Sequence, residues 1–446
     1  MRPLAVEPAL AWDQPSERAG GPASCSGGLG PTRPQDGRLE PAHALLAVRP
    51  LPGAASGSLP PLPRLSGALP VTQPGGSRVD PREDRRKVGA PVSIQEIQEA
   101  LRPLAQTRSV RWCGVAPQRL TGGEYADVTV WRKAKAEGWE AGFTGLQTCG
   151  SPWGCPCCMV KLAAERSELL ERVVSRWGLE RVLMLTLTVR HGPGLLLKPM
   201  REQMSAAWKW LQQTREFREL VRRFGLEFVR ALEATWSEEN SWHPHAHALL
   251  FLDRVPSADD VAWMKERFFV LWHEAVVRFL GARCAPSRAH GVDLREASSG
   301  RYVAKMGLEL AGAAFKRARG AKSMSVAEIA AGAAEGDEAC VKLWKHWQCG
   351  MRGAKALSWP TRADSKLREL REECEKELAA ERTSKLAARE VVATIRHEEW
   401  RAVGVLPWVR EAILDVVVGG GDAGDVQDVI DDALAEWCRR RATVAT

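Results

Sequence analysis

The sequence has few tyrosines, few histidines and no long apolar run. Only 2 of its 446 residues are tyrosine and 9 are histidine. No uninterrupted apolar stretch approaches the roughly 20 residues that cross a bilayer, which excludes a transmembrane helix. The first residues show no basic segment leading into a long apolar run, so we predict no signal peptide. We therefore expect a soluble, cytoplasmic protein whose 11 cysteines are reduced thiols or metal ligands rather than disulfides.

Length and charge allow several domains and a polyanionic partner. A chain of 446 residues can form two or three domains with a substantial core. Its formal net charge of +8 is a mild basic excess that suits nucleic acid without demanding it. Residues 1–90 hold 15 of the 27 prolines and one of the 18 tryptophans. Such a segment buries too little apolar surface to offset its ordering entropy, so we predict that residues 1–92 are disordered.

Apolar periodicity predicts an α+β protein with a central antiparallel sheet and helices packed on it. Helical spacing and strand-like runs alternate in the order strand, helix, strand, strand, helix between residues 181 and 279, which is typical of that architecture. A strand near 291–295 follows. The predicted segments are a Cys-rich part at 93–180, the sheet domain at 181–320, a further segment at 321–362 and a charged helical tail at 363–446. Within the tail, residues 367–379 could dimerise or cover the core.

Three of the nine histidines occur together, in the run SWHPHAHALLFLD at 241–253. Side chains alternate between the two faces of a strand and rise about 3.3 Å per residue, so His245 and His247 should point the same way about 7 Å apart. Two imidazoles in this position can bind one metal ion, whereas a hydrogen-bonded histidine-rich sheet edge is the alternative. We predict metal binding.

A carboxylate from the preceding strand can complete this site. The run LEFVRALEATW at 226–236 and the polar turn after it predict a β-hairpin with the histidine strand. Folding about residues 239–240 brings Glu233 opposite His245 and His247. Glu238 or Glu239 could be the third ligand instead, but these turn residues cost less to leave in water. A mixed N/O site suits a labile Mn²⁺ or Mg²⁺ better than structural zinc.

A second group of metal-ligand residues precedes the predicted sheet. Cys155 and Cys158 form a C-x-x-C pair, and Cys149 and Cys113 would complete a four-cysteine zinc site. Scattered buried cysteines or a redox pair are the alternatives, but four clustered thiols in a reducing compartment favour structural zinc. Cys157 is a spare thiol that leaves the ligand assignment open.

The two tyrosines of the chain are Tyr125 and Tyr302. Tyr302 lies near the start of a predicted helix with Lys305 three positions on, hence on the same face. A phenol is a weak nucleophile at neutral pH, and a nearby metal and ammonium group would help it attack a phosphate. A core aromatic with its hydroxyl at the surface is the alternative for Tyr302.

Several motifs occur in a fixed order. They are CGSPWGCPCC at 149–158, LMLTLTVRH at 183–191, LEATW at 232–236, HPHAHALLFL at 243–252, GRYVAK at 300–305, and GDEACVKLWKHW with GAKALSW between 336 and 359. Together they resemble the motifs of HUH endonucleases, and most closely those of the single-tyrosine replication initiators of bacterial rolling-circle plasmids. The resemblance covers about residues 110–362.

The resemblance implies a site-specific DNA nickase. A Mn²⁺ or Mg²⁺ ion on His245, His247 and Glu233 would polarise the scissile phosphate, with His243 as a reserve ligand or flanking residue. Tyr302 would attack, releasing a 3′ hydroxyl and joining the 5′ phosphate to the tyrosine, and Lys305 would offset negative charge. The implied partners are the plasmid double-strand origin, single-stranded at the nick, and host replication proteins such as a helicase.

Three positions depart from the pattern of these initiators. Ala246 stands where a bulkier aliphatic residue is usual between the paired histidines. Ser298 stands four residues before the tyrosine, where some relatives carry a glutamate that helps water cleave the product, and Glu296 is the candidate substitute. Residue 306 is Met, so no second tyrosine follows and a two-tyrosine mechanism is not expected.

Contacts to DNA phosphates would come from Arg and Lys. The candidate clusters are Lys316–Arg319 and Arg439–Arg441, although charge runs are more often solvated faces. Two other functions fit the motifs less well. One is a related HUH transposase or relaxase-like nickase, and the other is a non-catalytic DNA-binding protein with zinc in both the cysteine and the histidine groups.

Overall fold

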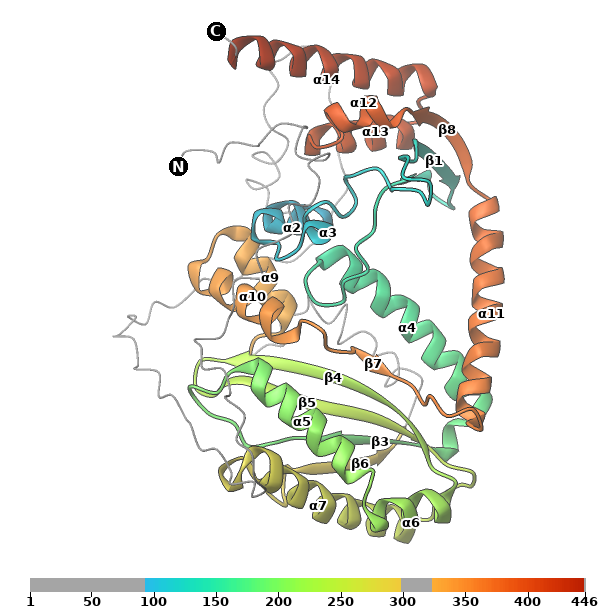
Figure 1. Ribbon diagram of the computed structural model, residues 1–446. Helices are drawn as coiled ribbons and strands as arrows, with labels where there is room; N and C mark the ends of the chain where they lie inside the picture. The colour runs from blue at the N-terminus through green and yellow to red at the C-terminus, as the bar shows by residue number, and fades with distance from the viewer. Residues whose placement is uncertain (1–92, 298–322, 445–446) are drawn as a thin grey trace.

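The computed structural model describes residues 93–297 and 323–444 (Figure 1). It confirms the predicted α+β class, with antiparallel sheets, helices packed on them and further helices toward the C-terminus. No helix within the described ranges is long and apolar enough to cross a membrane.

The larger sheet has five strands in the order β6-β3-β5-β4-β7, and every neighbouring pair is antiparallel. The strands are β3 (Val182–Leu187), β4 (Glu227–Ser237), β5 (Ser241–Phe251), β6 (Val292–Glu296) and the short edge strand β7 (Leu357–Ser358). Strands β4 and β5 form the predicted hairpin and pair along their whole length, from Glu227 opposite Phe251 to Ser237 opposite Ser241. The sheet therefore places consecutive motifs of the sequence on adjacent strands.

Helices α5 (Leu197–Leu211), α6 (Arg215–Phe224) and α7 (Ala258–Leu280) pack against one face of this sheet. Alternate residues of each strand supply that face, for example Leu183, Leu185 and Leu187 of β3 and Ala246 and Ala248 of β5. Because side chains alternate along a strand, the histidines of β5 lie on the opposite face.

On the histidine face, helices α4 (Pro156–Trp177) and α11 (Lys366–Ala387) cover the end of the sheet that includes Leu249 and Phe251. Figure 1 shows the two helices meeting at this end. Leu367, Cys374 and Leu378 of α11 are buried against α4 and the sheet. Of the two readings of residues 367–379, covering the core is the one that the structure shows.

A third layer lies beyond the opposite end of the hairpin. Helices α2 (Ile94–Leu101), α9 (Val326–Glu335) and α10 (Glu338–Met351) share a core with Leu232, Ala234 and Trp242 of β4 and β5. These helices use the face that α5 also covers. The histidine face at this end of the hairpin is not part of that core.

A second, smaller sheet was not predicted from the sequence. It has the order β2-β1-β8, formed by β1 (Val128–Ala134), β2 (Trp139–Thr144) and β8 (Glu390–Ile395). Helices α12 (His397–Val403), α13 (Pro407–Val418) and α14 (Ala423–Val444) complete its core. The tail is thus not purely helical: the β-branched run of β8 pairs with β1 across 258 residues of sequence, as at Arg132 and Glu390.

The remaining described elements are short. They are α3 (Arg108–Arg111) and the single 3₁₀ turns η2 (Arg102–Leu104), η3 (Leu179–Arg181) and η4 (Ala282–Cys284).

Candidate functional site

The histidines and Glu233 lie on one face of the β4–β5 hairpin. His243, His245 and His247 occupy alternate positions of β5, and Glu233 is the cross-strand partner of His245. This is the pairing expected from the sequence. Directly paired residues in antiparallel strands have Cβ atoms about 5 Å apart, which lets a glutamate reach both imidazoles.

The three predicted ligands converge on one point. Glu233 Oε2 lies 3.0 Å from His245 Nε2 and 3.1 Å from His247 Nε2. Their side chains retain 19%, 14% and 10% exposure respectively, so the group is partly shielded from water but open on one side. A cation at this point would be bound by two nitrogens and one oxygen.

The electrostatics of the group keep Glu233 charged. Burial alone would raise the pKa of Glu233, but hydrogen bonds with His245 and His247 outweigh burial and hold the pKa well below its usual range. A carboxylate that stays ionised can bind a cation without first losing a proton.

The spacing is compatible with two chemical states. Distances of 3.0 and 3.1 Å are ordinary for a charge-assisted hydrogen bond. They are also close to the separation of about 3.0 Å between adjacent ligands of an octahedral ion bound at about 2.1 Å. The donor set of two imidazoles and one carboxylate with an open side therefore fits a labile divalent ion as well as a closed hydrogen-bonded cluster.

His243 is turned to a different partner. Its ring stacks on His191, with 4.1 Å between ring centroids and 12° between planes, and it is not among the three residues whose ligand atoms converge. Burial lowers the pKa of His243 to about 4, with smaller contributions from His191 and His245, so the ring is neutral at neutral pH. His191 follows β3 and was not singled out by the sequence patterns.

The two turn glutamates are not part of the group. Glu238 and Glu239 are exposed in the loop between β4 and β5, beyond the last strand pair at Ser237 and Ser241. Glu296 is exposed at the end of β6. Tyr302, Lys305 and the basic run at 316–319 lie outside the described residues, and Arg439–Arg441 belongs to the end of α14.

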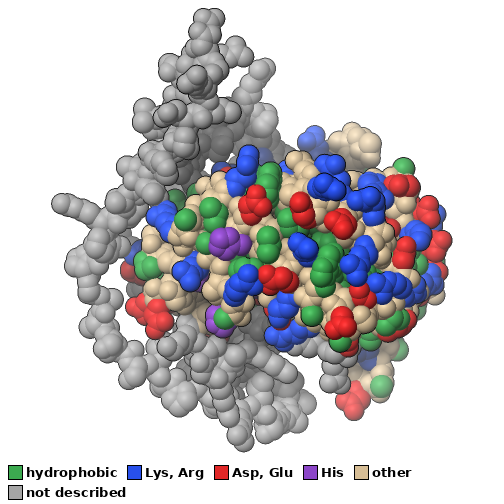
Figure 2. Space-filling view, turned by 90° about the horizontal axis from the view of Figure 1, so that it is seen from below, with side chains coloured by type: hydrophobic (Ala, Val, Ile, Leu, Met, Phe, Trp, Pro, Cys, Tyr) green, Lys and Arg blue, Asp and Glu red, His purple; other side chains and the backbone are tan. Residues whose placement is uncertain are grey.

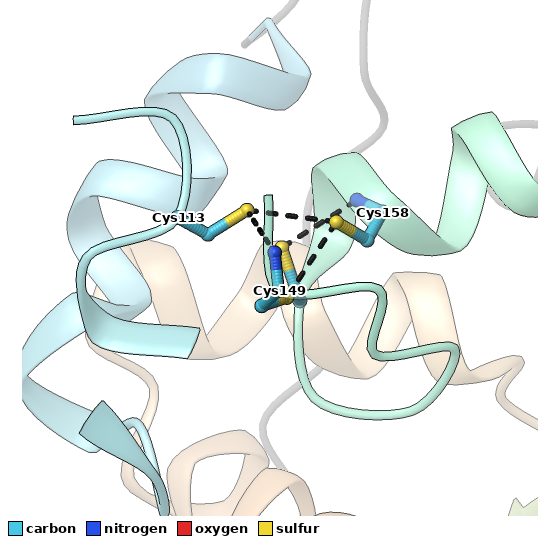
Figure 3. Close-up of side chains that lie close together, drawn as sticks. Cys113, Cys149 and Cys158 are labelled. Carbon is cyan, nitrogen blue, oxygen red and sulfur yellow. Dashed lines mark hydrogen bonds between the residues drawn. The ribbon is translucent and has the colours of Figure 1, made fainter. Parts of the chain in front are cut away.

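The four predicted cysteines also come together, and Figure 3 shows three of them, Cys113, Cys149 and Cys158. Cys113 follows α3, Cys149 follows β2, Cys155 caps the N-terminus of α4 and Cys158 lies in its first turn. Cys158 Sγ lies 3.5 Å from the sulfurs of Cys113 and Cys149. Four thiolates around a tetrahedral zinc at about 2.3 Å would have sulfurs about 3.8 Å apart, so little adjustment is needed.

The cysteine sulfurs are close enough to change one another's pKa. The pKa of Cys158 is lowered, first by its contact with Cys113, whereas the same neighbours raise the pKa of Cys155. One thiol can ionise readily, but further thiolates within this cluster repel each other unless a cation neutralises them. The backbone N–H of Cys149 donates to Cys113 Sγ at 3.3 Å and that of Ser151 to Cys149 Sγ at 3.4 Å, which also favours thiolates.

Cys157 is not one of the four. Its sulfur lies 3.8 Å from the carbonyl oxygen of Ile94 in the segment that begins α2, and burial raises its pKa to about 12. It is a neutral thiol at neutral pH and lies outside the group of four sulfurs that come together.

The charge pattern on one outer face of the protein shows whether that face could bind DNA phosphates. Figure 2 shows that, on the face seen from below in Figure 1, where α6 and α7 lie, Lys and Arg are interspersed with Asp and Glu. Among the charged residues on or next to α6 and α7, Arg223 and Arg254 pair with Asp260, and Arg288 pairs with Glu266. This face is therefore not a basic surface of one sign.

The fold and the histidine group define a protein with a candidate divalent-metal site on one face of an antiparallel sheet. Residues 143–278, which include β3, β4, β5 and the site, match a protein family described as "Replication protein". The match confirms that this part of the chain resembles replication initiator proteins, as the motifs indicated.

Individual relatives agree. The chain is 23% identical over 285 residues to "Protein rep" of Streptomyces lividans, covering 48% of this chain and 62% of that protein. It is 35% identical over 105 residues to "Protein rep" of Bacillus amyloliquefaciens, covering 22% and 30%. It is 26% identical over 129 residues to "Protein rep" of Streptococcus pneumoniae, covering 27% and 39%. The chain thus spans less than two thirds of these relatives, and no solved structure matches it significantly.

Proposed function

We propose that this protein is a rolling-circle plasmid replication initiator that nicks and rejoins one DNA strand at the plasmid double-strand origin. The convergence of His245, His247 and Glu233 within the segment that resembles replication proteins is the observation that carries the proposal. The proposed partners are the origin DNA, single-stranded at the nick, and host replication proteins such as a helicase, in the cytoplasm.

The three ligands would hold Mn²⁺ or Mg²⁺. When bound there, the ion would polarise the scissile phosphate and offset the charge that develops on its oxygens. Glu233 stays ionised at neutral pH, so it holds a negative charge toward the ion. The two imidazoles present Nε2 to the same point because the strand period puts them on one ridge.

Tyr302 is the proposed nucleophile. Its phenolate oxygen would form a bond to phosphorus while the bond from phosphorus to the 3′ oxygen breaks. The 3′ hydroxyl would then prime synthesis, the 5′ phosphate would remain on the tyrosine, and Lys305 would offset negative charge nearby. Glu296, which is exposed on β6, is the proposed base for hydrolysis at termination.

The cysteine group is proposed to hold structural zinc. It is closed, since its four thiols are all supplied by the protein, which distinguishes it from the open histidine group. Zinc there would contribute to folding rather than to strand cleavage.

A suicide oligonucleotide tests the nicking proposal. A single strand that carries the origin nick site should give a covalent DNA–protein adduct that requires added Mn²⁺ or Mg²⁺, and Tyr302→Phe should abolish it. Tyr125→Phe is a matched control, because Tyr125 is the other tyrosine and lies before β1 of the smaller sheet, 5.9 Å from the ring of His397. Adduct formation by Tyr302→Phe would show that the nucleophile is wrong. Absence of an adduct in the unaltered protein would favour a non-catalytic, zinc-stabilised DNA-binding protein.

A further inference from the structure

His245 and His247, the two proposed metal-binding histidines, each have a hydrogen-bond partner at Nδ1, and the two partners differ. His245 Nδ1 lies 3.3 Å from the backbone oxygen of His243. His247 Nδ1 lies 3.0 Å from the side-chain hydroxyl of Thr186 on the neighbouring strand. In both rings Nε2 faces Glu233, so each partner of Nδ1 fixes the orientation that brings the ring to the site.

The chemistry of imidazole makes these outer contacts matter. A ring that binds a cation through Nε2 carries its proton on Nδ1, and that proton needs an acceptor. A backbone carbonyl can only accept, so it favours a proton on Nδ1 of His245. A hydroxyl can accept or donate, so Thr186 can satisfy His247 when Nε2–H faces Glu233 and also when Nε2 binds a cation.

The sheet fixes Thr186 in this place. Thr186 is the cross-strand partner of His247 in the β3–β5 pair. Its neighbours Leu185 and Leu187 are fully buried on the opposite face, so a one-residue slip of β3 would expose both. The β-branched side chain of threonine also restricts its rotamers, which holds the hydroxyl beside the ring.

We propose that Thr186 is a positioning residue that sets the divalent-metal affinity of the site by orienting His247. The inference rests on the proposed metal site. It assigns a role to a side chain of β3 that would not itself contact the metal. His247 is the more deeply buried of the two ligand side chains, with 10% exposure against 14% for His245, so water is less able to replace the hydroxyl.

The test compares three variants of the full chain with Mn²⁺ alone, without DNA, by electron paramagnetic resonance of free Mn²⁺. Thr186→Val removes the hydroxyl at nearly constant shape and should weaken Mn²⁺ binding about 10- to 100-fold, as loss of a ligand-orienting contact typically does. Thr186→Ser retains the hydroxyl and should restore binding to within about threefold of the unaltered protein. Thr188→Val is the matched control, because the Thr188 hydroxyl donates to backbone oxygens of His290 and Gly291 rather than to a histidine. It should bind Mn²⁺ normally.

The outcomes separate this inference from the metal proposal. If the unaltered protein binds no Mn²⁺, the metal proposal fails. If the unaltered protein binds Mn²⁺ and Thr186→Val binds it equally well, or Thr188→Val weakens binding as much, the role of Thr186 is refuted. If Thr186→Val does not fold, the unaltered protein loaded with Cd²⁺ decides by nuclear magnetic resonance. The Nδ1 proton of His247 should then exchange slowly with water, and rapid exchange would overturn the inference.

Discussion

The histidine group and the cysteine group are both candidate metal sites, but the chain assembles them differently. Glu233, His245 and His247 come from one hairpin, whose strand register alone brings them together. The cysteines come from a loop after α3, a loop after β2 and the start of α4. The first site therefore depends on local pairing, and the second depends on tertiary assembly.

The cysteine group also lies where the two sheets are connected. Residues 114–148, between Cys113 and Cys149, include β1 and β2 of the smaller sheet. The two ends of this segment are joined by the hydrogen bond from Gly114 N to Gln147 O at 2.8 Å. Nearby, the Trp400 indole donates to Val115 O at 2.7 Å. A metal bound by these cysteines would link both ends of residues 114–148 to the start of α4.

The largest expected effect is at the histidine group, where a substitution should reduce nicking activity but not the stability of the fold. We predict that His247→Ala lowers metal-dependent nicking about 10²–10³-fold, because one ligand and one donor to Glu233 are lost. The larger sheet should remain folded, since the core beneath α5, α6 and α7 lies on the opposite face and His247 is not among the apolar residues packed beneath α4 and α11. Nicking rates and circular dichroism measure the two properties. His290→Ala, at an exposed histidine before β6, is the control and should leave nicking unchanged.

The reverse pattern is expected at the cysteine group. Cys158→Ser should lower the free energy of unfolding by about 3 kcal/mol or more, because a structural metal stabilises only the folded state. Metal content and urea denaturation provide the measurements. Cys157→Ser is the matched control, since its neutral thiol lies 3.8 Å from the Ile94 carbonyl oxygen and is not one of the four that converge, and should change stability little. Equal losses in the two variants would contradict the four-cysteine assignment.

A smaller effect concerns the contact between α2 and α13, one of the helices packed on the smaller sheet. Burial tends to raise the pKa of Glu99, but Arg102 and Arg410 outweigh it and lower the pKa. Glu99 accepts from Arg102 Nε at 2.8 Å and also from Arg410 of α13. Glu99→Gln leaves the largely buried Arg410 without its charge partner and should cost about 2 to 4 kcal/mol at pH 7.

The direction of the Glu99 pKa shift predicts how this contribution to stability changes with pH. Because the folded pKa of Glu99 is depressed, its stabilisation is fully present above about pH 4.5, its ordinary value, and is lost as the pH falls toward the folded pKa. The stability difference between the unaltered protein and Glu99→Gln should therefore shrink below about pH 4.5. Glu375→Gln, in an exposed helical pair with Arg371, is the control and should change stability by less than about 0.5 kcal/mol. A difference that is constant with pH would refute the ion pair.

The sequence predicted the histidine site because two local rules suffice for it. Alternation put His245 and His247 on one face, and the hairpin register put Glu233 opposite them. Thr186 was not predicted as a partner of His247, because that contact depends on how β3 pairs with β5, which no local pattern specifies. The roles of Tyr302 and Lys305 stay predictions.

The smaller sheet shows where sequence reasoning failed and why. Strands β1 and β2 are partly exposed, and a register shift between Val130 and Trp131 interrupts their alternation. Strand β8 lies among charged helices, and its partner β1 is remote in sequence. Local sequence patterns do not specify pairings between such distant strands, so the sequence predicts only helices for the tail.

Anomalous X-ray diffraction from crystals soaked in Mn²⁺ tests the central claim most directly. The account predicts a manganese peak bound by His245 Nε2, His247 Nε2 and a Glu233 oxygen. The peak should be lost in His247→Ala crystals and retained in His290→Ala crystals. A fully ordered hairpin with no peak at these atoms, in crystals of a protein that still forms the DNA adduct, would contradict it.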